Sequence, residues 1–223
     1  MPNDDAAQDR APSGNIRKSY DTVAREYADE IYAELAGKPF DRELLDRFAQ
    51  RVRGRGRVCD LGCGPAQIAR YLRDRGVDAF GLDLSAGMLA EARRLNPDLQ
   101  FVQSSMLALG LGAETLAGIA AFYCIIHIPR SQVVAALDEM RRALQRGGCL
   151  LITFHLGTED SHHEALFGRP VSLDVALFTT AEMTGYLEAA GLHTEEVRER
   201  DPYAPEIEYQ SRRGYILASR LPD

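Results

Sequence analysis

The sequence predicts an α/β domain: a mostly parallel seven-stranded sheet with helices on both faces and an antiparallel hairpin at its C-terminal end. From residue 57 to residue 155, short apolar segments alternate with amphipathic helical segments. That alternation is typical of parallel strands joined by right-handed helical crossovers. The last two apolar segments, 192–201 and 214–219, have a polar loop but no helix between them. We therefore expect these two strands to pair antiparallel.

The chain of 223 residues has the length of one such domain with additions, and we place it at residues 15–223. Residues 1–14 are polar and contain two prolines and a glycine, so we expect them to be disordered. Apolar residues recur every three or four positions over 16–35 and again over 40–52, which predicts two amphipathic helices. We interpret residues 15–53 as a helical lid.

The remaining elements follow from periodicity and from turn residues. Five apolar segments, interrupted by Gly, Asn and Pro, predict the first five strands, and the segments with a period of 3.6 predict four helices. The expected strands are 57–61, 78–83, 99–103, 116–126 and 149–155, and the expected helices are 67–75, 86–95, 132–145 and 180–190. We expect Gly147 and Gly148 to end the third of these helices.

Residues 156–178 break this rhythm. The segment has no clear periodicity, and it contains His162 and His163 together with acidic residues and Gly or Pro breakers. Its length without a secondary-structure signal is typical of a functional loop. We interpret it as an insertion close to the site at which an acceptor binds.

Composition excludes several classes of protein. Apolar residues make up 45% and charged residues 26% of the chain, and the net charge is −7, which is unfavourable for binding nucleic acid. No apolar run approaches the ~20 residues of a membrane span, and the acidic N-terminus does not have the pattern of a signal peptide. The four cysteines are all in or beside apolar segments, as expected of reduced residues in the cytoplasm. The spacing of the cysteines and histidines does not predict a metal site.

The most informative motif lies at the end of the first strand. Asp60 ends an apolar run and is followed by Gly62 and Gly64, which allow a sharp turn and a close approach of backbone to a ligand. A dinucleotide-binding turn has a third glycine three positions later, but Gln67 stands there. Asp60 would repel a pyrophosphate and would suit a ligand that carries an ammonium and a sulfonium.

A second carboxylate ends the second strand. Asp83 follows the apolar run 79–82, and a carboxylate at this position accepts hydrogen bonds from both hydroxyls of a ribose. The alternative is that Asp83 caps the following helix, a role that Ser85 can fill instead. Leu84 and Met88 are candidates for an apolar wall against adenine, although ordinary core packing explains them too.

These motifs together resemble the class I S-adenosylmethionine-dependent methyltransferases, and most closely their small-molecule branch, often called type 11. The resemblance covers residues 15–220. It rests on the turn Val58–Ala66, on Asp83, on 101–106 and on the segment 141–148, which ends in Gly147-Gly148. It implies a Rossmann-like fold, S-adenosyl-L-methionine as the cofactor and methyl transfer to a small molecule.

The resemblance also implies roles for single residues. Asp60, Gly62 and Gly64 would line the methionine part of the cofactor, Asp83 would hold the ribose, and Ser105 with Met106 would flank the adenine. Two positions depart from the family pattern. Ala66 stands where many members have a third glycine, and Ser105 stands where an aspartate is usual. Alanine is small enough to be tolerated at position 66, and a serine oxygen at position 105 still accepts a hydrogen bond, although without the charge assistance of a carboxylate.

Candidates for the acceptor side are histidines and tyrosines. His127 and His155 follow the fourth strand and end the fifth, where ligands of α/β sheets bind, and a histidine can remove a proton from a hydroxyl or amine. Packing or capping is the alternative role for His127. Tyr20 and Tyr27 are seven residues apart on one helix face and would close over a sulfonium, with core packing as the alternative.

We therefore expect a cytoplasmic methyltransferase that forms O- or N-methyl products and has no nucleic-acid or membrane partner; its oligomeric state stays open. Two other functions compete with this interpretation. A nucleotide-dependent oxidoreductase using NAD(P) is disfavoured by the missing third glycine and by Asp60. A non-catalytic domain of the same fold is disfavoured by the intact set of motif residues, although a fold does not determine a function. In the loop 202–213 we interpret Arg212 and Arg213 as exposed charges, with acceptor contact as the alternative.

Overall fold

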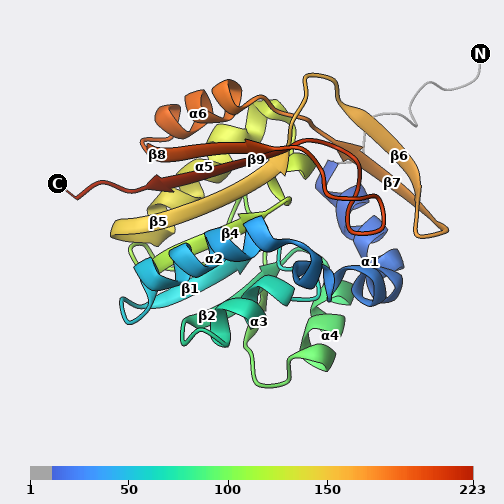
Figure 1. The fold of residues 1–223 in the computed structure, drawn as a ribbon, viewed down its shortest axis with the longest axis horizontal. Coiled ribbons are helices and arrows are strands. Elements are labelled where there is room, and N and C mark those ends of the chain that lie inside the picture. Colours follow the sequence, from blue (N-terminus) through green and yellow to red (C-terminus); the bar gives the residue numbers. More distant parts are fainter. Residues whose placement is uncertain (1–11, 223) are drawn as a thin grey trace, which may run out of the picture.

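A computed structural model describes residues 12–222 and contains the expected sheet (Figure 1). Seven of its described strands form one sheet in the order β3-β2-β1-β4-β5-β9-β8. Neighbours from β3 to β5 pair in parallel, and β9 pairs antiparallel with both β5 and β8. The strands are β1 (Arg57–Leu61), β2 (Asp78–Asp83), β3 (Phe101–Gln103), β4 (Leu116–Phe122), β5 (Leu144–His155), β8 (His193–Arg200) and β9 (Arg213–Ser219). The predicted fold class is confirmed.

Helices cover both faces of the sheet, because alternate residues of the strands point to opposite sides. Val58 packs with α2 and α3 in one apolar cluster, whereas Cys59 packs with α5 and α6 in another. The helices of the described chain are α1 (Pro12–Ile31), α2 (Pro39–Val52), α3 (Gln67–Arg73), α4 (Ala86–Leu95), α5 (Arg130–Ala143) and α6 (Thr180–Ala189), with short 3₁₀ turns η1 (Glu34–Gly37) and η2 (Ile125–His127). Of the segment 1–14 that we expected to be disordered, residues 12–14 begin α1, and the rest lies outside the described residues.

The strand order determines where a ligand can bind. The chain runs outward from β1 through β2 to β3, and then crosses to β4 and β5 on the other side of β1. At this reversal the connections after β1 and β4 leave in opposite directions and open a crevice at the carboxyl ends of these strands. Of the predicted site residues, Asp60 lies near the end of β1, Gly62 and Gly64 follow that strand, and His127 follows β4.

Several boundaries differ from the prediction, and the differences at β4 and β5 are the largest among the strands. The helix α5 ends at Ala143, and β5 begins at once at Leu144. Gly147, with φ +71°, lies inside β5, where the pairing with β4 shifts register. The glycines therefore mark an irregularity within a strand rather than the end of a helix. The fourth strand also ends earlier than expected, at Phe122, and His127 ends the turn η2.

We expected the segment 156–178 to be irregular. It instead contains an antiparallel pair of strands, β6 (Ser161–Leu166) and β7 (Arg169–Val175). Figure 1 shows this hairpin beside α1, and the side chain of Ser19 joins the two elements. Its Oγ accepts a hydrogen bond from the backbone N–H of Ser172 at 2.9 Å and donates to the carbonyl of Ser172 at 3.2 Å. Polar side chains face outward on most of the hairpin, which hides the strand period in the sequence.

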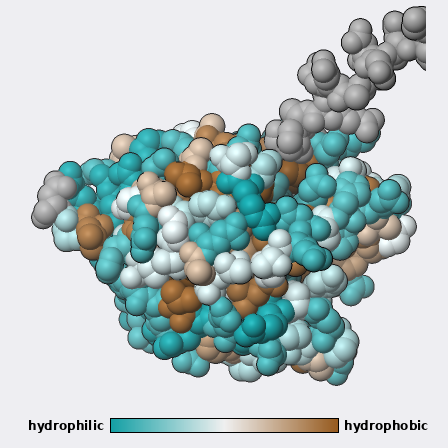
Figure 2. All heavy atoms as spheres, turned by 90° about the horizontal axis from the view of Figure 1, so that it is seen from above, coloured by the Kyte–Doolittle hydropathy of each residue, from teal (hydrophilic) through white to brown (hydrophobic). Residues whose placement is uncertain are grey.

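The surface is mixed. On the face drawn in Figure 2, hydrophobic residues form small groups among hydrophilic ones. Within residues 12–222, no helix is long and apolar enough to cross a membrane.

Candidate functional site

A cavity of about 890 Å³, open to solvent, lies at the carboxyl ends of β1, β2 and β4. Ten of the twelve predicted site residues line it, and they come from α1, the turn after β1, the end of β2, the start of α4, the loop after β3 and η2. These ten are Tyr20, Tyr27, Gly62, Gly64, Asp83, Leu84, Met88, Ser105, Met106 and His127. The structure therefore brings together residues that are spread over more than 100 positions.

The turn after β1 is held in a left-handed conformation. The φ angles are +66° at Gly62, +52° at Gly64 and +72° at Ala66. Such angles favour glycine, and alanine is strained there. Ala66 is fully buried next to Cys63 and Leu89, so its methyl group fills space in the core. The small side chain is compatible with the turn, as expected from the sequence.

Asp83 links this turn to the next element. One carboxylate oxygen accepts a hydrogen bond from the backbone N–H of Gly64, and the other accepts one from the N–H of Ser85, both at 2.8 Å. Burial raises the pKa of Asp83, and these hydrogen bonds oppose the rise. A carboxylate has about four acceptor positions, so it retains capacity for two hydroxyl donors from the cavity. Ser85 caps α4 by accepting from the N–H of Met88 at 3.0 Å.

An apolar wall continues from Asp83. Four apolar side chains line the cavity together with it: Leu84, Met88, Met106 and Leu107. Ser105 is also at the wall, but its Oγ already accepts a hydrogen bond from the N–H of Leu107 at 3.2 Å. The hydroxyl hydrogen of Ser105 has no hydrogen-bond acceptor among the described residues. Flat aromatic ligands bind in such apolar slots with a few polar groups at the edge.

Two further lining residues, Tyr20 and His127, form a hydrogen-bonded pair. The Tyr20 hydroxyl lies 2.6 Å from Nε2 of His127, and Nδ1 of His127 lies 3.2 Å from the carbonyl oxygen of Asp174 in β7. A carbonyl only accepts hydrogen bonds, so Nδ1 carries the hydrogen and the Nε2 lone pair accepts from Tyr20. Burial lowers the pKa of His127 to about 4. At neutral pH the imidazole is therefore uncharged and able to take up a proton at Nε2.

The sequence of this chain is similar to those of known proteins. Residues 58–148 match the family model described as a methyltransferase domain. The chain is 34% identical over 140 residues to a malonyl-[acyl-carrier protein] O-methyltransferase of Enterobacter lignolyticus, an alignment covering 61% of this chain and 47% of the relative. It is 30% identical over 156 residues to a demethylmenaquinone methyltransferase of Beutenbergia cavernae, covering 69% of this chain and 63% of the relative.

Residues 58–148 are a methyltransferase domain, and the similarity to both relatives supports a class I S-adenosylmethionine-dependent enzyme. It spans about half to two thirds of the length of the curated relatives it matches. Among solved structures, a DhpI–SAH complex has the same fold, with a TM-score of 0.73 at 20% identity over 95% of this chain and 98% of that chain.

Asp60, unlike the other predicted cofactor residues of this methyltransferase domain, does not reach the cavity. Its side chain is 1% exposed and lies behind the turn, where Oδ2 accepts a hydrogen bond from the N–H of Ala69 at 2.8 Å. Burial raises its pKa to about 7, so the carboxyl is only partly ionised at neutral pH. In the structure Asp60 therefore holds the start of α3, and its contact with a cofactor stays a prediction.

His155 lies away from the cavity. Its Nδ1 is 2.6 Å from the Arg213 guanidinium and 2.6 Å from the Ser211 hydroxyl. A guanidinium only donates, so Nδ1 must accept. Burial and then the charge of Arg213 lower the pKa of His155 to about 3. Its ring packs on Tyr123, with centroids 5.1 Å apart. A catalytic role for His155 is untested, and Nδ1 is not free to act as a base.

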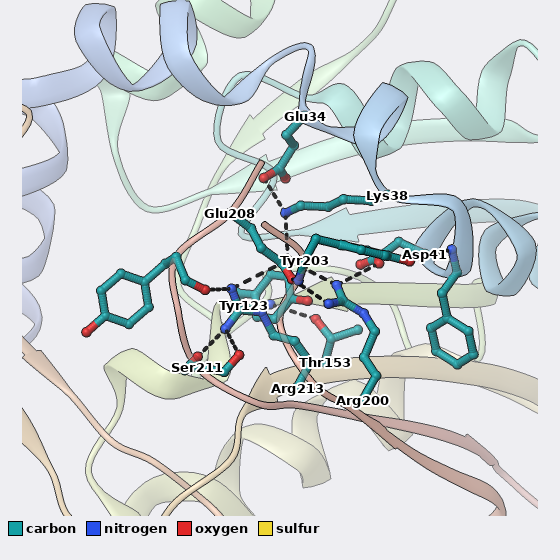
Figure 3. Close-up of polar contacts among 12 residues, drawn as sticks. Glu34, Lys38, Asp41, Tyr123, Thr153, Arg200, Tyr203, Glu208, Ser211 and Arg213 are labelled. Carbon is teal, nitrogen blue, oxygen red and sulfur yellow. Dashed lines mark hydrogen bonds and ion pairs between the residues drawn. The ribbon is translucent and has the colours of Figure 1, made fainter. Parts of the chain in front are cut away.

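A cluster of buried charges, which we call the charge cluster, lies beyond Tyr123 (Figure 3). Six side chains from η1, the start of α2, the ends of β8 and β9 and the loop between these strands form alternating ion pairs. They are Glu34, Lys38, Asp41, Arg200, Glu208 and Arg213. Arg213 is only 2% exposed, so our interpretation of it as an exposed charge is wrong. Residues so far apart in sequence leave no local pattern, and sequence reasoning missed the cluster.

Tyr123 is another residue that the sequence did not single out for a role. It lines the cavity and adopts φ +53°, which is rare for a bulky residue. Its N–H bonds to Thr153, and its ring faces Lys38 and Arg213 of the charge cluster. Strained residues are common at functional sites. Within the described residues, no group of three or more His, Cys, Asp or Glu side chains could hold a metal ion.

Gly62→Ala is expected to reduce the free energy of unfolding by about 2–4 kcal/mol, from the strain of a left-handed alanine and from overpacking. A Cβ at this position would lie 2.3 Å from Cβ of Cys124. Gly54→Ala is the matched control, because Gly54 has φ +75° with no atom within 4 Å of an added Cβ. Urea unfolding of both variants measures the difference. Equal losses in the two variants would show that the contact with Cys124 is unimportant.

Proposed function

We propose that this chain transfers a methyl group from S-adenosyl-L-methionine to a small-molecule acceptor. The observation that carries the proposal is one continuous cavity lined by the glycine turn, by Asp83 and by the Tyr20–His127 pair. These groups match the chemistry of the cofactor and of an acceptor that gives up a proton when it is methylated.

The residues present fit the cofactor. Asp83 retains acceptor capacity for the ribose hydroxyls, and the wall of Leu84, Met88 and Met106 suits adenine. Gly62 and Gly64 expose backbone to the methionine part. We propose that Tyr20 and Tyr27 supply aromatic faces and hydroxyl oxygens beside the sulfonium, which is an attractive arrangement for a cation.

When bound, S-adenosylmethionine supplies an electrophilic methyl group on a positively charged sulfur. Tyr20 and His127 would remove a proton from the acceptor: Tyr20 accepts it at the phenolic oxygen while its own proton passes to Nε2 of His127. The His127 ring is kept in the required tautomer by the carbonyl of Asp174. Orientation within the covered cavity provides much of the rate of an in-line displacement.

The acceptor we propose is a small molecule with a hydroxyl or amine group. The two relatives are named for different acceptors, one carried by a protein and one a quinone precursor, so membership of the family does not specify the acceptor. The net charge of −7 argues against a nucleic acid. We propose that the helical segment 15–53 and the hairpin segment 156–178 cover the acceptor. A cytoplasmic location is supported by four free cysteines.

Calorimetric titration of the full chain tests this function. S-adenosylhomocysteine should bind and NADH should not; the reverse result would favour a nucleotide-dependent oxidoreductase. Incubation with a metabolite pool and S-adenosylmethionine should then add ~14 Da to one component, a methyl in place of a hydrogen, when that acceptor is aligned for transfer. Binding of S-adenosylhomocysteine without any such product would favour a non-catalytic domain.

Asp83→Ala is expected to weaken S-adenosylhomocysteine binding by about 1–3 kcal/mol, because two hydrogen bonds to the ribose are lost. Asp78→Ala, at the other end of β2, is the control, since Asp78 is exposed and pairs with Arg73. Calorimetry of both variants gives the comparison. Unchanged affinity in Asp83→Ala would rule out the ribose contact.

A further inference from the structure

Asp21 connects α1 to the cofactor side of the cavity. Its Oδ1 accepts a hydrogen bond from the Ser85 hydroxyl at 2.6 Å and another from the backbone N–H of Gly87 at 2.9 Å. Both donors belong to the start of α4, where the helix dipole favours a negative charge. Asp21 therefore acts as a second cap for α4, supplied by a helix 64 residues earlier in the chain.

The contact continues to Asp83. A serine hydroxyl has one hydrogen, and Ser85 gives it to Asp21, which turns a lone pair of the same oxygen toward the N–H of Met88. The backbone N–H of Ser85 donates to Asp83, whose other oxygen accepts from Gly64. Ser85 is 1% exposed, so water does not replace these bonds readily. A hydrogen-bonded chain thus runs from α1 through Ser85 and Asp83 to the glycine turn.

Close packing of the two helices makes this chain possible. A Cβ at Gly87 would lie 3.0 Å from Cα and 3.1 Å from the carbonyl oxygen of Asp21. These are backbone atoms, which cannot rotate away. The residue next to Asp21 is Tyr20, whose hydroxyl meets His127. The docking of α1 on α4 therefore affects both the cofactor contacts and the Tyr20–His127 pair.

We propose that Asp21 is a positioning residue of the cofactor site: it holds α1 on α4 and, through Ser85, keeps Asp83 oriented toward the ligand. The inference rests on the proposed function, because the ligand is the methyl donor. Asp21 does not itself line the cavity, so its effect on binding is transmitted through the lining residue Ser85.

Calorimetry with S-adenosylhomocysteine tests the proposal on the full chain. Asp21→Ala should weaken binding about tenfold or more, and Asp21→Asn should recover most of the affinity, since its amide oxygen can accept both hydrogen bonds. The control is Asp29→Ala, which removes an exposed carboxylate of the same helix that pairs with Arg25 and should leave the affinity within about twofold.

Gly87→Ala provides an independent variant, because it separates the helices without changing any charge and improves the helix propensity of α4. It should also weaken binding. In steady-state assays Asp21→Ala should raise KM for the methyl donor more than it lowers kcat. Wild-type affinity in both Asp21→Ala and Gly87→Ala, or no recovery in Asp21→Asn, would overturn the role of Asp21. Failure of the wild-type chain to bind S-adenosylhomocysteine would instead overturn the proposed function.

Discussion

Glu208→Ala is expected to lower the free energy of unfolding by about 3–5 kcal/mol, because removal of one partner leaves buried charges uncompensated. The carboxylate of Glu208 accepts a hydrogen bond from Arg200 at 3.0 Å and one from the N–H of Tyr203 at 2.7 Å. Lys38 and Arg213 each lie 3.5 Å from its Oε2 (Figure 3). Its side chain is 1% exposed, so solvent does not screen these charges.

The charge state of this carboxylate is stable over the usual pH range. Burial alone would raise its pKa, but the hydrogen bonds from Arg200 and from the N–H of Tyr203 lower the pKa of Glu208 to about 2. Because the folded pKa is below the unfolded one, Glu208 contributes stability above the unfolded pKa of about 4.3. That contribution is lost as the pH falls from there toward 2.

Urea unfolding near pH 7 measures the effect. The control is Glu199→Ala, since Glu199 pairs with the exposed Arg212 at the same end of the sheet and exposed pairs contribute less than about 1 kcal/mol. Glu208→Gln keeps the shape and removes the charge, and it should lose most of the same stability. If Glu208→Ala is no less stable than Glu199→Ala, the cluster is not a structural support.

The second large effect concerns turnover. His127→Ala should reduce kcat by about 10²–10⁴-fold, the usual contribution of a general base, while binding of S-adenosylhomocysteine changes little. Tyr20→Phe removes only the hydroxyl that is hydrogen-bonded to Nε2, through which we propose that the acceptor's proton passes, and it should also lower kcat. The control is His193→Ala, at the exposed start of β8. Wild-type turnover in His127→Ala would exclude His127 from the mechanism.

The pH dependence gives an independent test of this base. With a pKa of about 4, His127 is neutral at every pH above about 5, and kcat/KM should fall only below that range. A histidine with an ordinary pKa of about 6.5 would lose activity two units higher. The wild-type profile on the acidic side therefore separates the two cases, and an inflection near pH 6.5 would contradict the buried tautomer described above.

The prediction from sequence was most successful where local signals decide the structure. Strand ends and the turn Gly62–Gly64 were located because an apolar run followed by glycines has few other conformations. It failed for the hairpin β6–β7, whose outward side chains are mostly polar, and for Gly147, since a glycine ends helices and also marks irregular strands.

The sequence by itself determined the fold class and the edge of the sheet at which ten predicted site residues gather, because parallel strands bring their carboxyl ends together. The tertiary structure alone decided three side-chain arrangements. Asp60 turns under the loop, the Tyr20 hydroxyl meets His127, and Glu208 joins Arg200 and Lys38. Such contacts depend on how whole helices dock and on which way each side chain points. A local sequence pattern records neither, whether the partners are nine positions apart, as for Asp60 and Ala69, or more than 100 apart, as for Tyr20 and His127.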